Sequence, residues 1–444
     1  MTYIAHKRED GTIQSVREHS EKTAFLSGQF AVKELTDICF AMGLLHDIGK
    51  YQKSFQKRIQ GDPIRVEHAI CGAKASLEQY GKGPLGLLLS LCIAGHHSGI
   101  PDCGGLYDTA ELPSLYGRLK RGSEDYGVYA QELTLPQLKE EDLCALLLRY
   151  CRTKDELLEG YAFLTRYCFS CLTDADTIDT MQAMGFAPPE PLRADFTRCR
   201  EILEGRLHAF HCVTPLQKAR ASLQKQVFKN INQDAEIYLM GMPTGSGKTL
   251  ASIECALIRA ALKKKKRIIY VIPYNSIIDQ TVAVLEELFG DSAQILRHQS
   301  SFSYEDAEDL DEDYRQSAIY GCENWDAELI VTTAVQFFES VYGNRRGKLR
   351  KLHNMADSIL IFDEAHLLPL SYLQPCLRAI AYITKFLHSE AIFLTATMPD
   401  FASLIREYAL QSSEIVDLVT DHSEFTVFKK TNTRTWERCP MISF

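Results

Sequence analysis

The sequence predicts a multidomain protein in which an all-α domain is followed by an α/β domain built on a parallel sheet. Between about residue 15 and residue 185, apolar residues recur with helical spacing, which favours a bundle of helices. After residue 211, short β-branched stretches alternate with helical ones, as is typical of parallel strands joined by helices. We therefore divide the chain into the all-α domain, a linker, the α/β domain and an irregular tail, at residues 1–185, 186–210, 211–425 and 426–444.

The composition excludes a disordered chain and a generally cationic surface. Of the 444 residues, 45% are hydrophobic and 24% are charged, and the formal net charge is −9. A nucleic-acid partner therefore requires a local basic groove. The longest apolar run, Leu85–Ala94, is too short to cross a bilayer, so we expect no membrane partner. The 14 scattered cysteines suit reduced thiols and a cytoplasmic location.

Each domain has its own expected elements. The first should contain four helices with a long irregular insertion before the last, at Val32–Ile48, Val66–Tyr80, Pro84–Ala94, Ile100–Pro136 (insertion) and Glu141–Met181. The second should contain five strands, at Glu236–Met240, Arg267–Ile272, Glu328–Thr332, Ser358–Phe362 and Ala391–Leu394. Because ligands bind at the carboxyl ends of strands in an open parallel sheet, we expect a crevice there.

A glycine-rich loop follows the first of these strands. It reads Met242-Pro243-Thr244-Gly245-Ser246-Gly247-Lys248-Thr249 and leads into an Ala/Leu-rich helix. Backbone N–H groups of such a loop converge at a helix N-terminus, where they favour a polyphosphate. Lys248 can reach the β- and γ-phosphates, and the Thr249 hydroxyl can hold Mg²⁺. The loop therefore predicts a site for ATP and Mg²⁺.

Histidines and aspartates gather at helix ends in the first domain. The set comprises His19, His46, Asp47, His68, His96, His97 and Asp176, with Asp174 as an alternative to the last carboxylate. Imidazole and carboxylate ligands together suit Mn, Fe, Co, Ni or Zn. A carboxylate such as Asp47 can bridge two cations about 4 Å apart, which suits displacement at a phosphodiester. Lys50, one turn beyond His46, can meet a phosphate oxygen.

These residues resemble the HD phosphohydrolase superfamily over roughly residues 10 to 185. The resemblance implies that His19, His46, Asp47 and Asp176 hold one transition-metal ion, and that Asp47, His68, His96 and His97 hold the other. It prefers Asp176 to Asp174, because the family aspartate stands just before the residue that precedes Ile178. We therefore expect two divalent ions, Mn, Fe, Co or Ni, with His46, Asp47 and Lys50 in catalytic roles.

A second set of motifs follows the phosphate loop. Asp363 can hold Mg²⁺, Glu364 can polarise the water that attacks the γ-phosphate, and His366 can couple nucleotide to motion. With Thr395-Ala396-Thr397, they resemble the first RecA-like lobe of superfamily 2 helicases. By that resemblance Gln217 reads adenine.

Two further loops resemble the helicase loops that contact the DNA backbone, where short polar groups suit phosphates. They are Pro273-Tyr274-Asn275-Ser276 and Thr332-Thr333.

Together the two halves resemble the CRISPR-associated nuclease-helicase family of type I systems. The stretches from Tyr270 to Gln280 and from Glu323 to Glu328 carry the likeness most clearly. The resemblance implies an antiviral effector that the Cascade surveillance complex recruits, that translocates 3′–5′ on DNA with ATP, and that cuts single-stranded DNA as an endo- or exonuclease. Only 47 residues follow Thr397, so we expect a truncated copy, or a second RecA-like lobe on a separate chain.

Two other functions are carried as alternatives. The first is an HD nucleotide phosphohydrolase that acts on small nucleotides. The second is a catalytically inert remnant that binds DNA or a partner. The attached motor lobe argues against the first, and the intact metal-ligand set argues against the second. Without a second lobe, we expect the polypeptide to bind ATP weakly and neither to hydrolyse it efficiently nor to unwind DNA.

Overall fold

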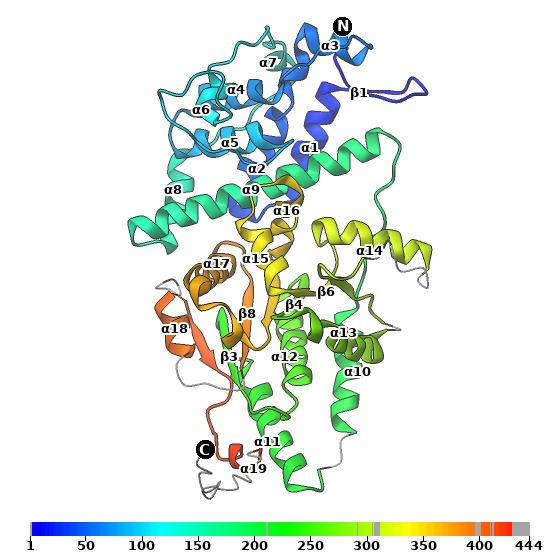
Figure 1. The fold of residues 1–444 in the computed structure, drawn as a ribbon, viewed down its shortest axis with the longest axis vertical. Coiled ribbons are helices and arrows are strands. Elements are labelled where there is room, and N and C mark those ends of the chain that lie inside the picture. Colours follow the sequence, from blue (N-terminus) through cyan, green and yellow to red (C-terminus); the bar gives the residue numbers. More distant parts are fainter. Residues whose placement is uncertain are drawn as a thin grey trace, which may run out of the picture.

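The computed structural model describes residues 2–209, 212–290, 292–303, 305, 311–395, 401–408, 410 and 413–428. A helical domain lies at one end of the molecule and a sheet domain at the other, and helix α9 (Lys154–Ala183) runs between them (Figure 1). Among the described residues, no helix combines the length and the apolar character needed to cross a bilayer.

The helical domain contains the predicted helices, preceded by a short antiparallel hairpin. The expected helix at Glu141–Met181 is two helices, since the chain is extended between Tyr150 and Lys154. Capping boxes begin α1 and α9 and satisfy their first N–H groups. The elements are β1 (Ile4–Lys7), β2 (Ile13–Ser15), α1 (Val16–Phe30), η1 (Lys33–Leu35), α2 (Thr36–Leu45), η2 (Ile48–Tyr51), α3 (Lys53–Ile59), α4 (Ala69–Tyr80), α5 (Pro84–Gly95), α6 (Leu115–Leu119), α7 (Tyr129–Glu132), α8 (Glu140–Tyr150) and α9.

The sheet domain confirms the expected alternation of strands and helices. Its strands are β3 (Ile237–Gly241), β4 (Arg267–Ile272), β5 (Leu296–His298), β6 (Leu329–Thr333), β7 (Ser358–Phe362), β8 (Glu390–Thr395) and β9 (Ile415–Asp417). Its helices are α10 (Phe196–His208), α11 (Pro215–Asn230), α12 (Lys248–Lys263), α13 (Asn275–Phe289), α14 (Glu312–Asn324), α15 (Ala334–Tyr342), α16 (Arg346–Leu349), η4 (Leu352–Met355), η5 (Ala365–Leu367), η6 (Leu370–Tyr372), α17 (Leu373–Phe386), α18 (Phe401–Tyr408) and α19 (Phe425–Phe428).

The described strands of this domain form one parallel sheet in the order β5-β6-β4-β7-β8-β3-β9. Alternate side chains enter different cores, as the two-residue repeat of a strand requires. Ile269 and Val271 of β4 pack into the core that includes α15 and α17, whereas Ile268 and Tyr270 pack against α12 and α13. The first of these cores continues into the helical domain, so the two domains share buried apolar surface.

The segment expected to be a linker is largely folded. Residues 196–208 form α10, whose Cys199 and Leu203 are buried in the core beneath α12. Asp195 caps this helix by accepting from the N–H groups of Thr197 and Arg198. Proline content and charge suggested a tether, but the apolar residues one turn apart give α10 a buried face, and it belongs with the sheet domain. Of the expected tail, residues 429–444 lie outside the described residues.

A buried ion pair crosses from α9 to the sheet domain. Arg350 donates to Asp174 Oδ1 from Nε at 2.9 Å and from Nη2 at 2.7 Å. Asn324 donates to the other carboxylate oxygen at 3.2 Å. Burial raises the pKa of Asp174, although the Arg350 charge opposes that shift. The carboxylate is therefore tolerated in the interface only because these donors surround it.

Replacing Arg350 should destabilise the protein. In Arg350→Met, Asp174 keeps its burial and loses its counter-charge, so we expect the free energy of unfolding to fall by about 3–5 kcal/mol. Urea unfolding measures the change. The surface variant Arg17→Met, which loses an exposed pair with Glu21, should cost no more than about 1 kcal/mol. Equal effects of the two variants would contradict this account, and Asp174→Asn combined with Arg350→Met should restore much of the stability.

Candidate metal centre and nucleotide cleft

The predicted metal ligands stand at the ends or on the buried faces of five helices. His46 caps the C-terminus of α2, and Asp47 follows it. His68 precedes α4 and His96 ends α5, so both imidazoles sit at helix ends that approach Asp47. His19 and Asp176 project from buried positions of α1 and α9. Five separate helices thus converge on one carboxylate.

The two oxygens of Asp47 face different sets of imidazoles. Oδ2 lies 3.1 Å from His19 Nε2 and 3.4 Å from His46 Nε2. Oδ1 lies 3.2 Å from His68 Nε2 and 3.3 Å from His96 Nε2. One carboxylate therefore joins two adjacent groups of nitrogen ligands, which is the arrangement that a bridging ligand of two cations requires.

The remaining predicted ligands complete these two groups. Asp176 Oδ1 lies 3.6 Å from His19 Nε2 and 3.7 Å from His46 Nε2, and His97 Nε2 lies 2.6 Å from His68 Nε2. In each group the ligand atoms all lie within 4.8 Å of one another; the groups are His19, His46, Asp47 and Asp176, and Asp47, His68, His96 and His97. The first group is buried throughout, whereas the second reaches the surface at His97.

Hydrogen bonds outside the centre fix the orientation of three imidazoles. His46 Nδ1 lies 2.8 Å from Gly43 O, and His96 Nδ1 lies 2.7 Å from Ile93 O. A carbonyl oxygen only accepts, so each Nδ1 donates and each Nε2 presents its lone pair to the centre. His19 Nδ1 lies 2.6 Å from Asp179 Oδ2, and the same tautomer follows if Nδ1 donates to that carboxylate.

The electrostatics of the centre suit bound cations. Burial raises the pKa of Asp47, but Lys50, His46 and His68 outweigh it and hold that pKa well below its usual value. Burial also acts on Asp176, whose pKa is held low by His46 and Arg346. Asp47 Oδ1 and His96 Nε2 are buried without a hydrogen bond to any described residue. Buried, ionised carboxylates beside unshared imidazole lone pairs form a donor set that fits Mn, Fe, Co or Ni.

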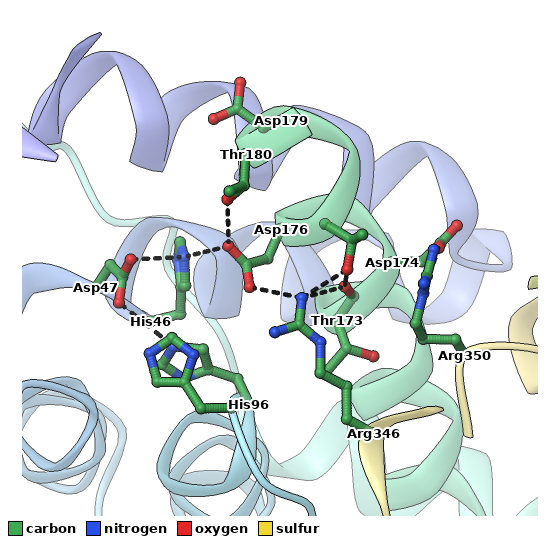
Figure 2. Close-up of polar contacts among 12 residues, drawn as sticks. His46, Asp47, His96, Thr173, Asp174, Asp176, Asp179, Thr180, Arg346 and Arg350 are labelled. Carbon is green, nitrogen blue, oxygen red and sulfur yellow. Dashed lines mark hydrogen bonds and ion pairs between the residues drawn. The ribbon is translucent and has the colours of Figure 1, made fainter. Parts of the chain in front are cut away.

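The structure separates the two carboxylates that the sequence left in competition. Asp176 faces the imidazoles of the first group, whereas Asp174 faces the sheet domain and pairs with Arg350. In Figure 2, Asp176 points toward His46 and Asp47, and Asp174 lies on the far side of the helix turn beside Arg350. The geometry therefore favours Asp176 as the ligand and gives Asp174 a structural contact.

Four residues that contact the metal ligands or Lys50 were not predicted from the sequence. Asp179 holds His19, and Gln14 donates to both oxygens of Asp179 at 3.2 and 2.8 Å. His6 Nε2 lies 3.3 Å from Lys50 Nζ, and burial lowers the pKa of His6 to about 3. Arg346 contacts Asp176. Only Asp179 carried a sequence signal, since it follows Asp176 by three residues and shares its helix face.

Lys50 lies where it compensates Asp47. Its Nζ is 2.7 Å from Asp47 Oδ2, and the side chain is buried. The expected contact with a phosphate oxygen therefore remains a prediction. Gly49 allows the approach of the two ligand-bearing segments, because a Cβ there would lie 2.1 Å from His68 O. The glycine thus lets the turn after Asp47 pack directly on the backbone of His68.

The nucleotide motifs meet at the carboxyl ends of β3, β7 and β8. The phosphate loop, Met242 to Thr249, joins β3 to α12, which begins after a left-handed N-cap at Gly247. Lys248 Nζ lies 2.6 Å from Glu364 Oε1. Tyr270 donates to Asp363 Oδ2 at 3.0 Å, and burial raises the pKa of Asp363.

His366 links the Asp-Glu-Ala-His motif to the end of β8. Its Nδ1 lies 3.3 Å from both Glu364 Oε2 and Thr395 Oγ1. Ala396 and Thr397 lie outside the described residues.

Two expectations about this domain require revision or remain open. Gln217 Oε1 accepts from the N–H groups of Val213 and Thr214 and completes the capping box of α11, so adenine recognition by Gln217 stays a prediction. Thr332 and Thr333 are buried; Thr332 donates to His298 O, and Thr333 caps α15. Their hydroxyls hold the fold, and a DNA contact by these side chains is not supported. Tyr274 of the other loop is half exposed.

Comparisons with known proteins match each of the two domains to a known family. The HD domain family matches residues 16–132, and the DEAD/DEAH box helicase family matches residues 221–405. The CRISPR-associated nuclease/helicase Cas3 of Haloferax volcanii is 27% identical over 87% of this chain and 48% of its own length. A match to the HD family followed by a match to the helicase family is consistent with a Cas3-type HD-helicase. The Helicase POLQ-like protein of Caenorhabditis elegans is 30% identical over 23% of this chain and 11% of its own length.

Solved structures share the fold across both domains. T. fusca Cas3-ATP has a TM-score of 0.61 and 15% identity, over 93% of this chain and 52% of that one. A chain in a CRISPR RNA-guided surveillance complex, pre-nicking, has a TM-score of 0.53 and 16% identity, over 92% of this chain and 49% of that one. The present chain spans about half the length of these relatives.

Removing Asp179 should weaken metal binding without removing a ligand. In Asp179→Ala, His19 loses the partner of its Nδ1, so we expect Mn²⁺ affinity of the first group to fall about 10- to 100-fold. Calorimetric titration measures both binding steps. The matched control is Asp155→Ala, which removes an exposed carboxylate from the first turn of the same helix. Unchanged affinity in Asp179→Ala would show that Asp179 does not orient His19.

Proposed function

We propose that this protein is a CRISPR-associated nuclease-helicase whose HD centre cuts single-stranded DNA with two divalent transition-metal ions. The observation that carries the proposal is the division of the Asp47 oxygens between two ligand groups. The similarity to the Haloferax volcanii nuclease/helicase supports a nucleic acid as the substrate. In this proposal the Cascade surveillance complex recruits the protein in the cytoplasm, and ATP drives 3′–5′ translocation.

The residues of the centre have distinct roles in this reaction. When bound, two cations lower the pKa of a bound water and offset charge on the phosphate oxygens. Asp47 would be shared by both ions, while His19, His46 and Asp176 would complete the buried group. His68, His96 and His97 complete the side that reaches solvent. Lys50 keeps Asp47 ionised and supplies positive charge beside the reacting phosphate.

The surface beside His97 offers a route for the DNA strand. A cavity of about 740 Å³ includes Ser98 and Gly99, the residues that directly follow His97, and is lined by Arg118 and Arg121. Both arginines pair with Glu67, which partly offsets their charge. We propose that the phosphate backbone approaches the exposed ligand group along this cavity, where contacts to backbone position a strand without reading its sequence.

The sheet domain contributes the nucleotide-binding half of a motor. Lys248, Thr249 and Asp363 would hold ATP and Mg²⁺, and Glu364 would activate the attacking water.

Cleavage assays test the nuclease. Circular single-stranded DNA incubated with the Mn²⁺-loaded protein should be cut, because an intact centre needs no free strand end to act as an endonuclease. Chelation should abolish cutting, and so should Asp47→Asn, since both ligand groups lose their shared charge. Hydrolysis of deoxynucleoside triphosphates or cyclic dinucleotides without DNA cleavage would instead identify an HD nucleotide phosphohydrolase. Absence of both stoichiometric metal and turnover would identify an inert remnant.

Nucleotide binding tests the motor half separately. Lys248→Ala should weaken binding of Mg-ATP by about 10- to 100-fold, because hydrogen bonds to charged groups contribute about 1.5–3 kcal/mol. Titration with a fluorescent ATP analogue measures this, and Lys263→Ala at the far end of α12 is the control. DNA cleavage should be the same in both variants when ATP is omitted. Equal nucleotide affinity in the two variants would refute the assignment of the phosphate loop.

A further inference from the structure

We infer that Arg346, a residue of the sheet domain, positions the Asp176 carboxylate in the metal centre of the helical domain, so that metal affinity depends on how the domains dock. The inference rests on the proposed function, because it assigns a role within the same centre. Arg346 stands at the start of α16. Its Nη2 lies 3.1 Å from Asp176 Oδ2 and donates to Thr177 Oγ1 at 2.5 Å.

The two oxygens of Asp176 are held from opposite directions. Oδ1 faces His19 and His46 at 3.6 and 3.7 Å and accepts from Thr180 at 3.3 Å. Oδ2 faces Arg346. In Figure 2, Arg346 reaches across from the sheet-domain ribbon and points its guanidinium at Asp176 and Thr173. The arginine thus fixes the rotation of the carboxylate, and with it the direction in which Oδ1 points.

The chain just before Arg346 also contacts the other ligand group. Asn344 O accepts from Ile100 N at 2.8 Å, and Arg345 forms an antiparallel bridge with Gly99, two residues after His97. Gly99 has a φ of +135°, and a Cβ there would lie 2.3 Å from Asn344 O. The close packing needs glycine at this position. Residues 344–346 therefore touch the segments that carry His97 and Asp176, one from each ligand group.

Residues 344–346 are held in place by the elements on either side of them. Arg350, one turn beyond Arg346, makes the buried pair with Asp174, two residues before Asp176. On the other side, α15 connects the segment directly to β6 in the sheet. A displacement of the sheet domain relative to α9 would carry Arg346 with it, and Asp176 would lose its outer partner.

Whether metal affinity falls or rises when Arg346 is replaced distinguishes an orienting role from a purely electrostatic one. An arginine beside a metal ligand disfavours a cation electrostatically, so loss of its charge alone would tighten metal binding. Loss of an orienting partner weakens metal binding, by about 10- to 100-fold in known sites. The geometry assigns the second outcome to Arg346, because its guanidinium contacts the oxygen that does not face His19 and His46.

The test compares two arginines that donate from the sheet domain to α9. Arg346→Met should weaken binding of Mn²⁺ at one of two steps by about 10- to 100-fold, measured from the electron paramagnetic resonance signal of free Mn²⁺. Arg346→Lys, which keeps one donor, should recover part of the loss. The control is Arg378→Met, which removes a 2.7 Å contact with Glu156 near the start of α9 and should leave both steps unchanged.

A second readout separates the metal centre from general instability. The Mn²⁺ concentration for half-maximal DNA cleavage should rise in Arg346→Met, while the rate at saturating Mn²⁺ is largely restored. Equal or tighter Mn²⁺ binding than wild type, in a variant that melts at the same temperature as Arg378→Met, would overturn the inference and leave the proposed function intact. Wild-type protein that binds no Mn²⁺ would overturn both.

Discussion

The rest of the structure depends on three buried carboxylates of helix α9. Asp174, Asp176 and Asp179 of α9 are almost completely buried, and an uncompensated charge in such a place is prohibitively unstable. Each carboxylate has hydrogen-bond partners from a different part of the chain. Arg350 of the sheet domain donates to Asp174, while His19 and Gln14 of the helical domain contact Asp179. Asp176 is contacted from both sides. The centre and the domain interface are therefore one continuous polar network.

The apolar packing reinforces this union. One face of the parallel sheet lies in a core that continues into the helical domain, through the helices packed around α9. The opposite face packs against α10, α12 and α13. The nucleotide motifs lie at strand ends of the sheet domain, whereas the His and Asp cluster lies in the helical domain. Helix α15 and the residues that follow it connect β6 of the sheet to Arg346, which contacts Asp176 of α9.

Local sequence patterns predicted the parts of this structure that depend on local chemistry. The β-branched strands and the phosphate loop were predicted almost to the residue, because strand propensity and glycine spacing act locally. The histidines and Asp176 were predicted as one cluster through a family resemblance. Arg346 carried no signal, since an arginine on a short helix gains its role only from a contact 170 residues away in sequence. Helix α10 was missed because prolines and charges outweighed its few apolar residues, and β5 and β9 because three residues hold too little pattern.

Those two short strands have a consequence for the molecule in a crowded solution. They are the two edge strands of the sheet, each only three residues long. An edge strand of that length exposes few unpaired backbone donors and acceptors, so it is a poor template for a strand from another molecule. The sheet therefore tapers toward both flanks, and its long, apolar central strands are shielded from the edge-to-edge growth that leads to fibrils.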